Sequence, residues 1–84
     1  MKEIIIYTTS TCPYCRRAKQ IFKENDLPFT EIQTEFGSEE MDELIKKTGH
    51  TTVPQIFIGD KFLGGCDDLI SAVEENELNA LLAD

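Results

Sequence analysis

The sequence predicts an α/β fold in which a mixed four-stranded sheet is flanked by helices. Short apolar runs alternate with segments of helical periodicity, a helix separates the first two runs, and only Gly59-Asp60 separates the last two. Strands joined by a helix run parallel through a right-handed crossover, whereas strands joined by a two-residue turn form an antiparallel hairpin. The expected element order is therefore β-α-β-α-β-β-α, with a further short helix at the end of the chain.

The first half of the chain contains the strand-helix-strand unit. Residues 4–7, Ile-Ile-Ile-Tyr, are apolar throughout, as in a central strand that is buried on both faces. Pro13 suits the first turn of a helix, and the expected buried face of that helix consists of Tyr14, Ala18, Ile21 and Phe22. Pro28 follows the end of this helix, and a short strand is expected over residues 29–32.

The second half begins with a helix between Ser38, a suitable N-cap, and Gly49, a natural C-terminal residue. Its inner face would carry Met41, Leu44, Ile45 and Thr48. Residues 55–58 and 61–63 form the expected hairpin, with Gly59 at the first turn position, as a type II′ turn requires. A third helix would bury Cys66, Leu69, Ile70 and Val73, and a last short helix would carry Leu78, Leu81 and Leu82.

Length and charge limit the possible functions. The 84 residues suffice for one small domain, and the net charge of −8 repels phosphate backbones and anionic lipid surfaces. We therefore expect neither nucleic-acid nor membrane binding. No segment has the ~20 apolar residues of a membrane span or the apolar core of a signal peptide. Three cysteines, an odd number, argue against a disulfide framework and favour a reducing, cytoplasmic location.

The motif Cys12-Pro13-Tyr14-Cys15 stands where the first strand leads into the first helix. A sulfur at a helix N-terminus lies beside unpaired N–H groups and the positive end of the helix dipole, which favours the thiolate of Cys12. Cys15 follows one turn later on the same face, within reach of a disulfide. Arg16 and Arg17 add positive charge nearby. The pattern indicates a redox-active pair of thiols.

Two other interpretations of the motif are less favoured. A lone C-x-x-C pair is also half of a zinc site, but the further candidate ligands, His50 and Cys66, are far apart and form no second pair. We therefore expect no metal. Two buried structural thiols fit less well, because polar loop residues precede Cys12 and charged residues follow Cys15.

Two further motifs are less specific on their own. In Thr52-Val53-Pro54 a proline stands directly before a strand; a cis Val53–Pro54 bond would explain it, and a trans proline that begins the strand is the alternative. Gly64-Gly65 leads into a helix whose N–H groups suit a carboxylate, and Asp67 and Asp68 could cap that helix or bind an ammonium group. Cys66 lies on the apolar face and is expected to be a packed thiol.

Together, in this order, these segments resemble the glutaredoxins over essentially the whole chain. The resemblance rests on Tyr7-Thr8 before the cysteine motif, on residues 52–58 and on residues 64–69. It is to the small bacterial, dithiol type. It implies a thioredoxin fold, a single glutaredoxin domain over residues 1–84, and a monomer. The implied activity is a glutathione-dependent thiol–disulfide oxidoreductase that acts on glutathionylated or disulfide-bonded proteins, with glutathione as co-substrate and no metal.

The resemblance also implies roles for the two cysteines and the proline loop. Cys12 would be the nucleophile and Cys15 the resolving thiol. Pro54 would be cis and lie against Cys12. The backbone of Val53 would pair with the cysteinyl unit of glutathione like an added strand, and Thr52 would help to hold that loop.

The remaining implied positions bind the other parts of glutathione. The N–H groups of Cys66 and Asp67, after Gly65, would receive the γ-glutamyl carboxylate, and the Asp67 side chain would receive the ammonium group. Tyr14 would line the groove. Many members of the family carry a lysine where this chain has Thr9. Lys46, Lys47 or His50 could supply a positive charge instead, although His50 is expected to be a solvent-facing loop residue.

Two alternative functions remain open at this point. One is an iron–sulfur cluster shared by two chains through Cys12 and two glutathiones, although family members of that kind usually carry Cys-Gly-Phe-Ser. The other is a thioredoxin-like electron donor to a reductase, although thioredoxins typically carry Trp-Cys-Gly-Pro-Cys and this chain has no tryptophan.

Overall fold

The computed structural model describes residues 1–83, and its centre is a four-stranded sheet. The strands are β1 (Ile4–Thr8), β2 (Thr30–Gln33), β3 (Gln55–Ile58) and β4 (Lys61–Gly64), in the order β2-β1-β3-β4. β1 pairs parallel with β2 and antiparallel with β3, and β3 pairs antiparallel with β4. The mixed sheet, the crossover and the hairpin predicted from the sequence are therefore confirmed.

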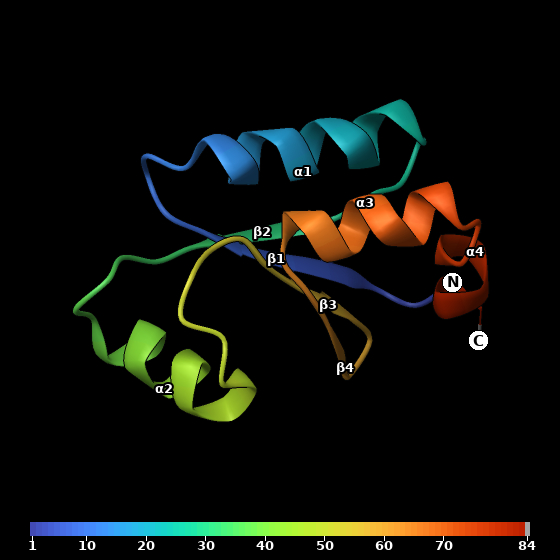
Figure 1. The fold of residues 1–84 in the computed structure, drawn as a ribbon. Helices are drawn as coiled ribbons and strands as arrows, with labels where there is room; N and C mark the ends of the chain where they lie inside the picture. Colours follow the sequence, from blue (N-terminus) through green and yellow to red (C-terminus); the bar gives the residue numbers. More distant parts are fainter. Residues whose placement is uncertain (84) are drawn as a thin grey trace.

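Helices cover both faces of this sheet (Figure 1). α1 (Pro13–Glu24) and α3 (Cys66–Glu74) lie together over one face, and α2 (Glu39–Thr48) lies over the other. The short α4 (Leu78–Leu82) follows α3, and the N–H of Lys2 donates to the carbonyl of Leu82 at 2.9 Å, which ties the N-terminal segment to α4. None of the described helices is long and apolar enough to cross a membrane.

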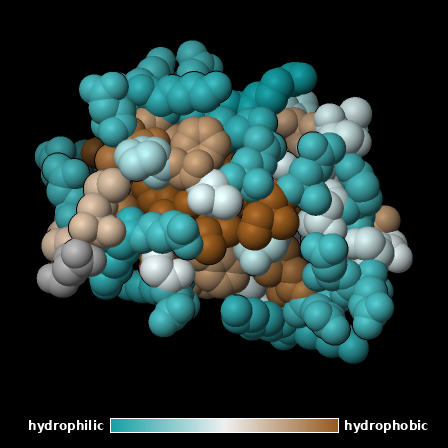
Figure 2. All heavy atoms as spheres, turned by 180° about the vertical axis from the view of Figure 1, so that it is seen from behind, coloured by the Kyte–Doolittle hydropathy of each residue, from teal (hydrophilic) through white to brown (hydrophobic). Residues whose placement is uncertain are grey.

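The alternation of side chains along β1 divides the core into two unequal clusters. The larger cluster lies between the sheet and α1 and α3, and its buried residues include Ile4, Ile6, Phe22, Ile56 and Leu69. The smaller cluster lies under α2; its buried residues are Met41, Leu44 and Phe57. The opposite side of the molecule shows apolar residues across its middle, surrounded by polar side chains (Figure 2).

Local signals fix the ends of the helices as the sequence predicts. The hydroxyl of Ser38 accepts from the N–H of Met41 at the start of α2, and Gly49 ends that helix with a left-handed φ of 72°. Gly59 is the turn residue with positive φ, at 59°, as a turn with glycine in its first position requires. Three strands differ from their predicted bounds by one residue at one or both ends, because neighbouring strands rather than the local sequence set where pairing ends.

One predicted core residue is not in the core. Tyr14 has the spacing of a buried helix residue, but its side chain is 65% exposed. It belongs to the first turn of α1, in which the buried residue is Cys15, so the buried face of the helix begins one residue later than the spacing suggests.

Candidate functional site

Cys12 stands at the N-cap of α1, as the sequence predicts. Its backbone is extended, and its sulfur accepts a hydrogen bond from the N–H of Cys15 at 3.1 Å. That N–H is one of the groups that a helix leaves unpaired at its N-terminus, and its bond to sulfur favours negative charge there. The two sulfurs are joined in a disulfide, and the Cα atoms of Cys12 and Cys15 are 5.2 Å apart. The oxidised form of the dithiol is therefore the one described.

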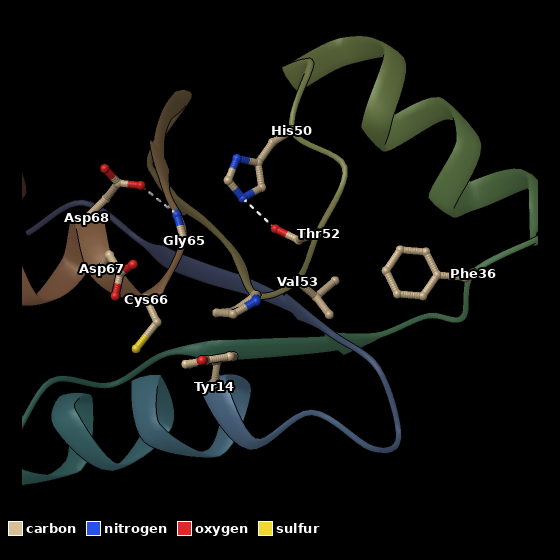
Figure 3. Close-up of a pocket in the computed structure, with 10 residues that line it drawn as sticks. Tyr14, Phe36, His50, Thr52, Val53, Gly65, Cys66, Asp67 and Asp68 are labelled. Carbon is tan, nitrogen blue, oxygen red and sulfur yellow. Dashed lines mark hydrogen bonds between the residues drawn. The ribbon is translucent and has the colours of Figure 1, made fainter.

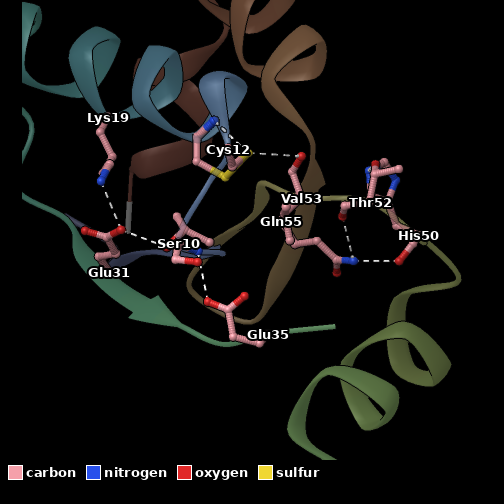
Figure 4. The surroundings of a disulfide bond; sticks show 11 residues. Ser10, Cys12, Lys19, Glu31, Glu35, His50, Thr52, Val53 and Gln55 are labelled. Carbon is pink, nitrogen blue, oxygen red and sulfur yellow. Dashed lines mark hydrogen bonds and ion pairs between the residues drawn. A yellow bond between two sulfur atoms is a disulfide. The ribbon is translucent and has the colours of Figure 1, made fainter. Parts of the chain in front are cut away.

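The loop before β3 lies against this disulfide (Figure 4). The Val53–Pro54 peptide bond is cis, and the carbonyl oxygen of Val53 is 3.7 Å from the sulfur of Cys12. Of the two possible isomers at Pro54, the cis form is the one present. The loop thus brings the backbone of Val53 into contact with the sulfur of Cys12.

Gln55 holds this loop from below. Its side chain is fully buried, and its amide NH2 donates to the carbonyls of His50 and Thr52, while its oxygen accepts from the hydroxyl of Thr48 at 2.9 Å. The loop carbonyls are therefore paired inside the protein. These hydrogen bonds fix the path of residues 50–54 and do not involve the backbone of Val53.

The N-terminus of α3 forms another wall. Gly65 is its N-cap, and the Gly65 N–H donates to the carboxylate of Asp68 at 2.9 Å. Of the two aspartates expected to cap the helix or to bind a ligand, Asp68 is committed to capping. Gly64 has a φ of +130°, and a Cβ at this position would collide with the Asp68 side chain, so glycine is required here. Asp67 is exposed and lies next to Cys66 (Figure 3).

A cleft of about 500 Å³ joins these walls (Figure 3). It brings together seven of the predicted binding positions, which come from α1, the loop before β3 and the start of α3: Tyr14, Thr52, Val53, Pro54, Gly65, Cys66 and Asp67. Asp68, Phe36 and His50 complete the lining. The segments that carry motifs in the sequence therefore meet at one place, next to Cys12.

Cys66 is free and buried, as expected of a packed thiol, although it also reaches the wall of the cleft. Burial raises the pKa of its thiol, and the nearby charge of Asp67 raises it further, against a smaller opposing effect of Arg17. Both leading causes favour the protonated thiol, which is the less reactive form.

Two residues of the cleft have surroundings that their local sequence does not predict. His50 is not a solvent-facing loop residue: its ring nitrogen lies 3.0 Å from the Thr52 hydroxyl, and its ring packs edge-on against Phe62. Phe36, in the loop between β2 and α2, belongs to none of the sequence motifs. The feature of the sequence that could have indicated Phe36 is its position as a lone aromatic residue in a polar loop, between Glu35 and Gly37, where no helical or strand pattern requires one.

Comparison with known proteins agrees with this geometry. The family model described as Glutaredoxin matches residues 4–63. The chain belongs to the glutaredoxin family. A glutaredoxin from Pseudomonas aeruginosa is 47% identical over 83 residues, which cover 99% of both chains. The family is one of thiol–disulfide oxidoreductases, and the Cys12–Cys15 pair fits its dithiol Cys-x-x-Cys motif.

Solved structures extend the similarity to the fold. The solution structure of glutaredoxin from Brucella melitensis has a TM-score of 0.86 and 43% identity, and covers 98% of this chain and 89% of its own. A buckwheat glutaredoxin–glutathione complex has a TM-score of 0.87 and 28% identity, and covers 96% of this chain and 76% of its own. The thioredoxin fold predicted for this chain is thus confirmed. Within residues 1–83 no three His, Cys, Asp or Glu side chains are grouped so that they could hold a metal ion.

Proposed function

We propose that this glutaredoxin reduces mixed disulfides between glutathione and proteins, and that it also reduces protein disulfides through both cysteines. The observation that carries the proposal is the position of the Cys12 sulfur. It accepts the Cys15 N–H at the start of α1, and it lies 3.7 Å from the carbonyl oxygen of Val53, in the wall of a cleft that offers loop backbone, helix N–H groups and the exposed carboxylate of Asp67. A thiol peptide with an α-amino acid end matches these three features.

The reaction on a glutathionylated protein needs Cys12 alone. The Cys12 thiolate attacks the glutathione sulfur, the sulfur–sulfur bond between glutathione and the protein breaks, and the sulfur of the protein leaves with the electron pair and takes up a proton to become a thiol. Cys12 is then disulfide-bonded to glutathione. A second glutathione thiolate attacks the glutathione sulfur of that bond, which forms glutathione disulfide and restores the Cys12 thiolate. The helix N–H groups favour Cys12 as leaving group in this second step.

The reaction on a protein disulfide needs Cys15 as well. Cys12 attacks one target sulfur and forms a mixed disulfide, and the Cys15 thiolate then attacks the sulfur of Cys12. The target leaves with both sulfurs reduced, and the enzyme is left with the Cys12–Cys15 disulfide. The 5.2 Å between the two Cα atoms suits such a bond. Two glutathiones return the pair to thiols.

The cleft offers partners for the cysteinyl and γ-glutamyl parts of glutathione. The backbone of Val53, next to Cys12, would pair with the cysteinyl unit, with Thr52 and the cis Pro54 supporting the loop. At the start of α3, the N–H groups of Cys66 and Asp67, after Gly65, would receive the γ-glutamyl carboxylate, and the Asp67 side chain the ammonium group. Tyr14 would cover the groove from α1.

The test is the reduction of the mixed disulfide of glutathione and 2-mercaptoethanol, with glutathione as reductant. We expect Cys12→Ser to abolish turnover and Cys15→Ser to retain a large part of it, because a second glutathione replaces Cys15 on this substrate. Equal loss in both variants would contradict the roles assigned to the cysteines. Reduction of the enzyme disulfide by thioredoxin reductase but not by glutathione would contradict the dependence on glutathione.

A further inference from the structure

The end of the cleft opposite α3 is formed by an exposed aromatic side chain. Phe36 is 56% exposed, and among the described residues the other exposed large hydrophobic side chains are Met1 and Tyr14. Phe36 and Tyr14 both line the cleft. Figure 3 shows Phe36 beyond Val53, on the side away from Asp67 and Cys66. An aromatic ring that is exposed to water lacks the favourable free energy of burying its apolar surface. A ligand group that covers the ring would gain that free energy on binding.

The loop that carries Phe36 is held in place on both sides. The N–H of Thr34 donates to the carbonyl of Thr8 at 2.8 Å, and the Ser38 hydroxyl donates to the carbonyl of Glu35 at 2.7 Å. The Glu35 carboxylate accepts the N–H of Ser10 at 3.0 Å, in the loop that leads to Cys12. The aromatic ring is therefore presented to the cleft by a loop with fixed ends, rather than by a free segment.

The charges around this end are negative. Glu35 precedes Phe36 in the chain, its carboxylate accepts the N–H of Ser10 in the loop before Cys12, and Glu39 and Glu40 begin α2. None of the described lysines or arginines is among the residues that line the cleft, and the histidine of the lining, His50, has its Nε2 3.0 Å from the Thr52 hydroxyl. A second carboxylate on a ligand would meet the Phe36 ring here, with the bonded Glu35 carboxylate in the loop that carries this ring and no described lysine or arginine in the lining.

These features concern the third residue of the tripeptide. With the γ-glutamyl group at Asp67 and the cysteinyl group at Val53, a linear tripeptide places its third residue toward Phe36. We infer that this end of the cleft selects γ-glutamylcysteinyl disulfides whose third residue ends in an uncharged group, such as an amide, over those that end in a free carboxylate. Phe36 and Glu35 are the residues that determine this selectivity, which rests on the proposed function.

The test compares two substrates that differ in one charge. They are the 2-mercaptoethanol mixed disulfides of glutathione and of its glycinamide form, and the measured quantity is the ratio of their kcat/KM values. We expect the amide to be favoured about three- to ten-fold at low ionic strength, and the ratio to approach one in 1 M salt, where the Debye length is only about 3 Å. A wild-type ratio of one or below at low salt would overturn the inference.

The variants assign the selectivity to residues. We expect Phe36→Lys to invert the preference and Glu35→Gln, which keeps an acceptor for the Ser10 N–H, to reduce it at least two-fold. Glu75→Gln removes an equal charge at the far end of α3 and should leave the ratio unchanged. An unchanged ratio in Phe36→Lys would refute the assignment, provided that its melting temperature shows it is folded. Failure to reduce either substrate would instead refute the proposed function, and the inference with it.

Discussion

The two aspartates at the start of α3 are neighbours with different surroundings, and this difference allows a matched experiment. Asp68 accepts the Gly65 N–H at 2.9 Å and so satisfies a donor that the helix leaves unpaired. Asp67 is exposed at the cleft, and its carboxylate is available to a ligand. We expect Asp67→Ala to weaken substrate binding without unfolding the protein, and Asp68→Ala to lower stability.

The magnitudes depend on the type of contact that each substitution removes. Loss of a helix N-terminal cap costs about 1 kcal/mol, which lowers the melting temperature of a domain of this size by about 4–8 °C. A hydrogen bond to a charged ammonium group contributes about 1.5–3 kcal/mol, or roughly ten- to a hundred-fold in kcat/KM. Because the ammonium group is remote from the reacting sulfurs, its loss should raise KM more than it lowers kcat.

The assay measures kcat/KM for each variant on two disulfides, one with a γ-glutamyl group and one without, together with a thermal melt. Asp67→Ala should lose activity on the first substrate only, and its melting temperature should stay near that of the wild type. The reasoning would be refuted if Asp67→Ala treated both substrates alike and melted at a lower temperature. Asp67 would then be a structural residue of the helix terminus.

Three further predictions concern stability and reactivity. Hydrogen bonds from the Thr8 hydroxyl (2.7 Å) and from Lys19 (3.0 Å) lower the pKa of Glu31 below its usual 4.5. The contribution of these two hydrogen bonds to stability is therefore complete above pH 4.5, and it is lost as the pH falls through the lowered pKa of Glu31. The melting temperatures of wild type and Glu31→Gln should converge between pH 7 and pH 3, and a constant difference would contradict this. Gly64→Ala should lower the free energy of unfolding by about 1–3 kcal/mol through backbone strain, and by more because its Cβ would collide with Asp68. The control is Gly37→Ala, at a φ of +90° with open space around the Cβ, and urea unfolding measures both variants. In the reduced protein, iodoacetamide at pH 7 should modify Cys12 well before the buried Cys66, and peptide mass spectrometry would measure the two rates. Equal rates would contradict the prediction that burial and a raised pKa make the Cys66 thiol unreactive.

The sequence predicts most of this fold because its local signals agree with one another. The apolar run in β1, the Ser38 and Gly49 ends of α2 and the glycine of the hairpin turn each specify local structure that the packed sheet also requires. The cleft is also predictable in large part. The motifs around Cys12, Pro54 and Gly65 mark the ends of successive elements, and the fold brings those ends together.

The rest depends on contacts between segments that are distant in the sequence. The period of α1 cannot show that Tyr14 is exposed while Cys15 is buried, because this depends on which distant segments pack against the first turn of the helix. Both aspartates of α3 have the same local pattern, and only the path of Gly64 and Gly65 makes Asp68 the capping residue. His50 and Phe36 reach the cleft through loops whose course is set by Gln55 and by the bond between Glu35 and Ser10.

The unequal division of the core has a consequence for how the molecule opens. The cluster under α2 has far fewer buried residues than the one under α1 and α3, so the layer of α2 should exchange its amide hydrogens through openings that cost less than global unfolding. The loops of Phe36 and His50 adjoin that weaker layer, whereas Cys12 and Asp67 belong to the stronger one. The wall of the cleft formed by these loops therefore rests on the layer that opens at lower cost, while Cys12 keeps its position at the N-terminus of α1 during such openings.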